Sequence, residues 1–186
     1  MGTLFSGTVG ALPAAVLLAV AVTCAVTDLW KGKIYNAVTY PAMVAGVLLA
    51  LVQFGVPGIF HALGGFAVGF FPAFVLFALG GMGGGDVKLL GAIGAIAGAV
   101  AATETLILAF VFGGIFALGK LAWHGRLFAT LGRTLRRLVG YVVPGLGRTP
   151  GATDEQRLEV RFGVAICVAL VATLWDLRSG ALSSLL

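Results

Sequence analysis

The chain has 186 residues, of which 60% are hydrophobic and only 10% are charged, and its mean hydropathy is +1.08. A soluble domain is about a quarter charged, so the composition excludes an ordinary soluble protein and indicates a bilayer protein. The net charge of +5 does not indicate nucleic-acid binding, because the basic residues concentrate in one segment between apolar helices.

The apolar runs predict an all-α polytopic membrane protein with six transmembrane helices. Met1–Gly10 contains no Lys or Arg, unlike a secretory signal, so the first apolar run is predicted to be a retained helix. A single helix over Val87–Lys120 would be about 51 Å long, too long for one crossing, which predicts a break near Thr103 and Glu104. The predicted helices cover residues 8–27, 37–54, 59–80, 87–102, 105–122 and 159–176.

The positions of Lys and Arg predict the orientation of these spans. With six spans, every Lys and Arg except Arg178 falls on the same face of the membrane. A five-span arrangement would divide them between the two faces. Because basic residues gather on the cytoplasmic side, we expect both termini outside and a basic cytoplasmic face.

The basic loop 123–157 contains apolar residues at helical spacing, with arginines between them. This pattern is typical of an amphipathic helix that lies on anionic headgroups, and a docking surface for a partner is the alternative. The whole chain, 1–186, is predicted to form one membrane domain that includes this cytoplasmic loop.

Two carboxylates stand out in this apolar chain. Asp28 is predicted to close the first helix, and Asp86 lies two spans later, in the stretch GGMGGGDVKLLGAIGAIAG. Two spans return the chain to the same face, so both side chains should lie at similar depth. Ionisable groups at such depth are costly and usually functional, and two adjacent carboxylates can work as an acid and a base.

Each aspartate also has a purely structural interpretation. Asp28 could mark the membrane interface beside Lys31, and Asp86 could be the N-cap of the following helix. An N-cap requires one Asp but no preceding glycines. The glycines permit positive φ or close backbone approach, and polar backbone at membrane depth is tolerated only against protein or water. The Gly and Ala residues of GAIGAIAGAVAA are predicted to permit close helix packing.

Three segments resemble the type IV prepilin peptidases, which are polytopic aspartic proteases of bacteria. GGGD at Gly83–Asp86 looks like the family's GxGD signature, and DLWKGKIYN at Asp28–Asn36 is similar to its first aspartate motif. RFGVAICVAL near the C-terminus is similar to its last helix. The chain departs from the family pattern at Tyr35, where Pro is usual, and at Arg161-Phe162, where Pro-Tyr is common.

This resemblance implies that Asp28 and Asp86 are the catalytic pair. It implies supporting positions at Gly83, Gly85, Lys88 and Asn36. It further implies an endopeptidase of the bacterial cytoplasmic membrane that cuts type IV prepilins after Gly at the cytoplasmic face, with no metal and no cofactor.

The chain resembles the short, peptidase-only branch that processes Flp-type pilins, because it lacks the cysteines and the length of a methyltransferase domain. We therefore expect no N-methyltransferase activity. A prepilin, the lipid bilayer and the pilus or secretion assembly machinery are the implied partners, and nucleic acid is not among them.

Other functional classes stay open at this point. A small proton- or cation-coupled transporter could use the same acidic pair, although the helix pattern has no inverted repeat. A presenilin-like protease also uses GxGD, but its Pro-Ala-Leu motif is absent here. A structural assembly subunit would tolerate loss of either aspartate. Cys24 and Cys167 form no Cys-x-x-Cys pair, which argues against a cysteine zinc site and favours small buried side chains.

Overall fold

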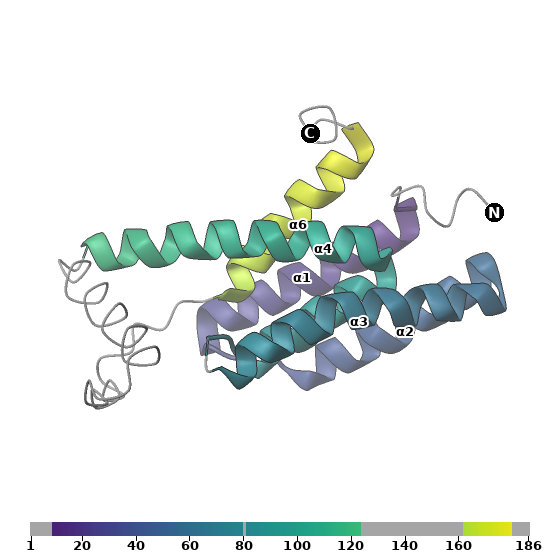
Figure 1. Cartoon of the computed structure of the whole chain (residues 1–186), viewed down its shortest axis with the longest axis horizontal. Helices are drawn as coiled ribbons and strands as arrows, with labels where there is room; N and C mark the ends of the chain where they lie inside the picture. Colours follow the sequence, from purple (N-terminus) through teal and green to yellow (C-terminus); the bar gives the residue numbers. More distant parts are fainter. Residues whose placement is uncertain (1–8, 80, 124–161, 180–186) are drawn as a thin grey trace, which may run out of the picture. The chain divides into compact units, whose positions relative to one another are not determined.

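The computed structural model describes residues 9–79, 81–123 and 162–179. Every regular element in these residues is an α-helix: α1 (Ala11–Lys31), α2 (Asn36–Phe54), α3 (Val56–Ala78), α4 (Gly84–Trp123) and α6 (Phe162–Ser179) (Figure 1). Each of them is long and apolar enough to cross a membrane. The prediction of an all-α polytopic membrane protein is therefore confirmed.

The predicted break between the fourth and fifth helices is in the wrong place. The structure has α4 where two helices, 87–102 and 105–122, were predicted, and its backbone leaves the helical conformation at Gly98 (φ 85°, ψ 178°). A positive φ of this size strongly favours glycine. Residues with a side chain, such as Thr103 and Glu104, rarely adopt it. The Thr103 hydroxyl donates to the Ala99 carbonyl over 2.9 Å, as it does inside a continuing helix.

The contacts on either side of Gly98 show that α4 doubles back there. Gly85, near its start, lies against Ile34, just beyond the end of α1. After the reversal, Phe110 lies beside Phe162 with ring centroids 5.6 Å apart, and the neighbouring Gly163 contacts Asp28 near the end of α1. Two antiparallel segments of α4 thus replace the fourth and fifth predicted helices.

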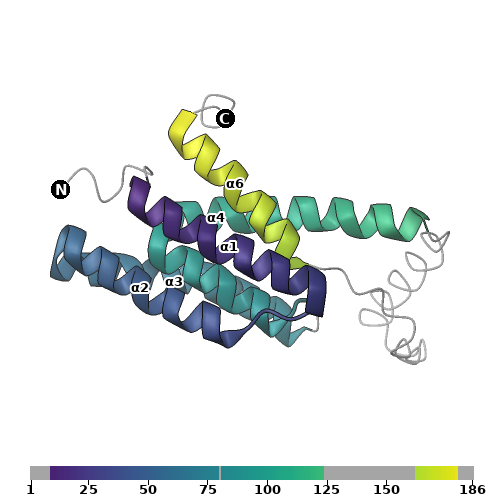
Figure 2. The same cartoon turned by 180° about the vertical axis from the view of Figure 1, so that it is seen from behind.

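Residues 1–113 and 161–186 form one compact unit, and residues 114–160 form a second. In the first unit, α1 packs on α6 and on α2, and α2 packs on α3 (Figures 1 and 2). The described part of the second unit is the end of α4, 114–123. Most of the predicted amphipathic segment, 124–157, lies outside the described residues, and a single domain over 1–186 stays a prediction.

The core of the first unit comes mainly from α1, α6 and the first segment of α4, with Ala73 of α3 and Ala109 of the second segment of α4 at its edge. Leu89, Leu90 and Ile93 are completely buried in its centre, whereas many large apolar side chains of α2 and α3 are exposed, as suits a surface that faces lipid. Small residues allow the close packing: a Cβ added at Gly65 would overlap the Gly94 carbonyl, and the reverse also holds. The predicted role of the Gly and Ala residues in close helix packing is confirmed.

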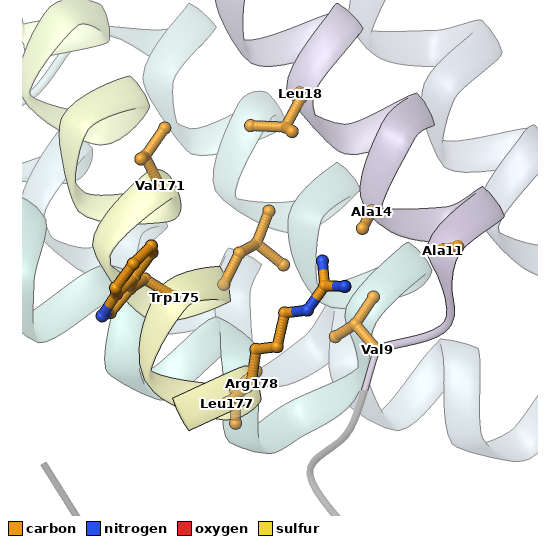
Figure 3. A pocket seen from close by; sticks show the side chains of 9 residues that line it. Val9, Ala11, Ala14, Leu18, Val171, Trp175, Leu177 and Arg178 are labelled. Atoms are coloured by element: carbon orange, nitrogen blue, oxygen red, sulfur yellow. The ribbon is translucent and has the colours of Figure 1, made fainter. Parts of the chain in front are cut away.

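A cavity lies at the end of the α1–α6 pair that is remote from Asp28. It has a volume of about 510 Å³ and lies between the start of α1 and the end of α6, lined by apolar side chains such as Leu18 and Trp175 and by one cation, Arg178 (Figure 3). Asp28 lies near the opposite end of α1. Arg178 and the two lysines Lys31 and Lys33 are therefore at opposite ends of the α1–α6 pair.

Candidate active site

A cavity of about 370 Å³ lies where α1 ends and α4 begins. Asp28 and Asp86 both line it and interact electrostatically, although they are 58 positions apart in the sequence. Each side chain is only 8% exposed. The remaining wall comes from the segment between α1 and α2 and from the start of α4: Gly32, Lys33, Ile34, Tyr35, Asn36, Gly83, Gly84 and Gly85.

Asp28 belongs to the last turns of α1. The helix continues through Lys31 and stops at Gly32, whose positive φ of 62° lets its N–H bond back to the Asp28 carbonyl over 2.9 Å. Asp28 therefore lies inside the helix rather than beyond residue 27, where the predicted helix ended. Its Oδ2 accepts a hydrogen bond from the Gly163 backbone N–H at 3.0 Å.

Asp86 lies in the first turn of α4 and is not its N-cap. The helix begins at Gly84, and the Asp86 N–H donates to the Gly83 carbonyl over 3.1 Å. The Gly83 N–H in turn donates a hydrogen bond to the Asp86 carboxylate, which is the half of a capping box that an acidic side chain at the third helical position supplies. A carboxylate in this position interacts favourably with the positive end of the helix dipole.

The glycines before Asp86 allow close approach rather than an unusual backbone. Among the described residues, positive φ occurs only at Gly32, Gly55 and Gly98, so Gly83 and Gly85 do not use it. A Cβ at Gly85 would lie 2.7 Å from the Ile34 Cβ, and one at Gly83 would lie 2.9 Å from Asp86 Oδ2. Gly84 has more room, since its Cβ would meet the Phe77 ring at 3.4 Å.

Lys88 and Asn36 are brought together by α4 and α2. Lys88 Nζ donates to Asn36 Oδ1 over 2.7 Å and lies 5.0 Å from the centre of the Tyr40 ring. Asn36 lines the cavity, whereas Lys88 is not among its lining residues and contacts Asn36 through this hydrogen bond. The pair therefore links the start of α2 to the helix that carries Asp86.

One residue that contacts the site, Gly163, was not singled out from the sequence. Gly163, the second residue of α6, packs directly on Asp28, since its Cβ would lie 2.9 Å from Asp28 Oδ2. Cys24, one turn before Asp28 on α1, is completely buried as predicted, whereas Cys167 is only partly buried. The stretch RFG at the start of the last apolar run could have drawn attention to Gly163. A single sequence does not reveal that this glycine contacts the end of α1.

No three His, Cys, Asp or Glu side chains gather as metal ligands do within the part of the chain that the structure describes. The ionisable side chains around the cavity are the two aspartates, Lys33 and Tyr35. The cavity thus presents two buried carboxylates beside glycine backbone.

Comparison with known protein families identifies a match over much of the chain. Residues 15–118, more than half of the chain and including both aspartates, match the type IV leader peptidase family. The chain belongs to this family. Membership identifies it as a protease that acts on type IV prepilin leaders, and its apolar helices make it a membrane protein. Comparisons with curated proteins and with solved structures give no match.

The clash at Gly85 yields a prediction for two adjacent glycines of this leader peptidase. Gly85→Ala should lower the thermal unfolding temperature of the detergent-solubilised protein by roughly 3–10 °C, because its Cβ would overlap Ile34. Gly84→Ala is the matched control and should leave the unfolding temperature unchanged or raise it slightly, because alanine favours the helix. Equal effects of the two substitutions would contradict the close approach of Gly85 to Ile34.

Proposed function

We propose that the chain is a membrane-embedded aspartic endopeptidase that uses Asp28 and Asp86 to remove the basic leader of a type IV prepilin after Gly. The observation that carries this proposal is the presence of both buried carboxylates on one cavity. Family membership supplies the reaction class, and the cavity supplies two groups with the chemistry that peptide hydrolysis requires.

The proposed reaction needs one carboxylate and one carboxylic acid. The carboxylate takes a proton from a water molecule, whose oxygen attacks the scissile carbonyl carbon, while the acid gives its proton to the carbonyl oxygen. When the tetrahedral intermediate collapses, the C–N bond breaks, the aspartic acid formed in the first step gives its proton to the leaving amine, and a hydroxyl of the intermediate gives a proton to the other aspartate. The pair returns to its starting protonation state, and one water molecule is consumed.

The charge and hydrophobicity of a prepilin suit a cleavage site near the membrane surface. It has a basic leader in the cytosol followed by an apolar helix in the bilayer, so its scissile bond lies near the membrane surface. Glycine before the cut makes local unwinding of the substrate helix less costly. The glycine backbone of residues 83–85 leaves room for an extended segment of substrate beside the carboxylates.

The proposed setting follows from the charge distribution. We place the cavity on the cytoplasmic side of a bacterial inner membrane, with both termini outside, because Lys31, Lys33 and Lys88 lie near it. The substrate is proposed to be a Flp-type prepilin, and the pilus or secretion machinery a partner. A proton- or cation-coupled transporter using the same acidic pair is the competing proposal.

Replacement of either aspartate tests the pair. In cells that co-express a Flp-type prepilin, Asp28→Asn or Asp86→Asn should reduce leader removal roughly 10²–10⁴-fold, because each change removes an acid–base group. Asp176→Asn, a buried acid of α6 outside the cavity, is the matched control and should leave processing near the wild-type rate. Leader removal is followed by the size of the pilin on a gel.

Wild-type processing that survives either substitution would overturn the two-aspartate mechanism. Survival of processing in both variants would favour the transporter proposal. If the wild type leaves the first prepilin uncut, the same comparison is repeated with type IV prepilins of other classes. Cleavage of one of those alone would replace the Flp-type assignment.

We also propose that the chain does not methylate the new pilin N-terminus. Purified protein incubated with mature pilin and S-adenosylmethionine carrying a labelled methyl group should transfer no label. Labelled pilin after incubation with wild-type protein, but not without it, would contradict this proposal.

A further inference from the structure

The first turn of α6 touches one of the two carboxylates and nothing in the proposed mechanism uses it. The Gly163 N–H donates to Asp28 Oδ2 over 3.0 Å, and a Cβ added at residue 163 would lie too close to the Asp28 side chain. Both groups are buried, which makes this hydrogen bond stronger than one exposed to bulk water.

From this contact we propose that Gly163 is a positioning residue for the peptidase reaction: its N–H and its lack of a side chain fix the orientation of Asp28 in the cavity. The inference rests on the proposed function of Asp28 and Asp86. It extends the active site to α6, a helix that lies outside the family match over residues 15–118 and adds no side chain to the cavity.

The surroundings of Asp28 act on its charge in two opposite senses. The end of its own helix carries partial negative charge, and Asp86 faces it from α4, so both neighbours oppose a negative charge on Asp28. Lys33 and Tyr35 line the cavity, and Lys31 and Cys24 each lie about one turn from Asp28 on α1. Residues 162–175 of α6 carry no ionisable side chain other than the Cys167 thiol. The positive end of α6 and the Gly163 N–H act in the opposite sense and favour the charged form of the carboxylate.

Glycine is the residue that permits this contact. A Cβ at position 163 would lie 2.9 Å from Oδ2 and 3.2 Å from the Cβ of Asp28, so any side chain would push the carboxylate away. Among the other glycines, Gly64 and Gly119 have no atom within 4 Å of an added Cβ. They provide matched controls for substitution and for changes to the backbone.

The same hydrogen bond has a simpler interpretation, in which Asp28 merely caps α6. The first N–H groups of a helix lack intrahelical partners, and a side-chain oxygen can satisfy one of them. The two interpretations differ in what they predict for catalysis. A cap stabilises the fold and leaves the rate per folded molecule unchanged, whereas a positioning contact alters the rate at constant folding.

The test is a change of the Gly163 peptide N–H to an ester oxygen, made by incorporating glycolic acid at position 163 of the full chain. This removes the donor without adding an atom that clashes. We expect kcat for prepilin cleavage to fall about 10- to 100-fold with KM within about twofold, because the lost bond contacts Asp28 and not the substrate. The acidic limb of the pH profile of kcat should move to higher pH by about one unit.

Gly163→Ala should lower kcat at least as much, whereas Gly64→Ala and an ester at position 119 should leave kcat and the pH profile as in the wild type. An ester at position 163 that lowers the unfolding temperature but keeps the wild-type kcat and pH profile would overturn the inference and leave only a helix cap. Asp28→Asn separates this inference from the function itself, because Asn can still accept the bond but carries no charge. If Asp28→Asn retains full activity, the proposed function fails; if it is inactive while the ester variant is normal, only the role of Gly163 fails.

Discussion

Two carboxylates buried together in an apolar helical bundle are the constraint on which the rest of this structure depends. Removing a charge from water is costly unless hydrogen bonds or opposite charges compensate for it. Backbone N–H groups supply that compensation at both aspartates: Gly163 at the start of α6 for Asp28, and Gly83 at the start of α4 for Asp86. The starts of two helices therefore converge on the end of α1, and the cavity lies between the end of α1 and the start of α4.

The convergence requires backbones to approach more closely than ordinary side chains allow. Gly85 lies against Ile34, Gly163 lies against Asp28, and the Gly65–Gly94 contact draws α3 onto the first segment of α4. Apolar burial offers little driving force between helices in lipid, so such close packing is a principal source of association. Of these glycines, Gly85 also lines the cavity, where it and the neighbouring Gly83 and Gly84 contribute backbone and no side chain.

Much of this arrangement could be predicted from the sequence, for identifiable reasons. Asp28 and Asp86 were found because charges are rare in the apolar runs and an even number of spans separates them. The break in α4 was placed at Thr103 and Glu104 because polar residues there suggested a turn, but the helix continues through them and reverses at Gly98, where positive φ is required. Gly163 escaped notice because its importance depends on which distant helix end it meets.

The most direct test of the account is whether Asp28 and Asp86 share one cavity. In a chain with Cys24→Ala and Cys167→Ala, the pair Asp28→Cys and Asp86→Cys should be joined by the shortest bifunctional thiol reagent, as detected by mass spectrometry of the digested protein. Asp86→Cys combined with Asp176→Cys, outside the cavity, should not be joined. Failure of the first pair to cross-link, although the reagent labels each cysteine alone, would contradict the central claim.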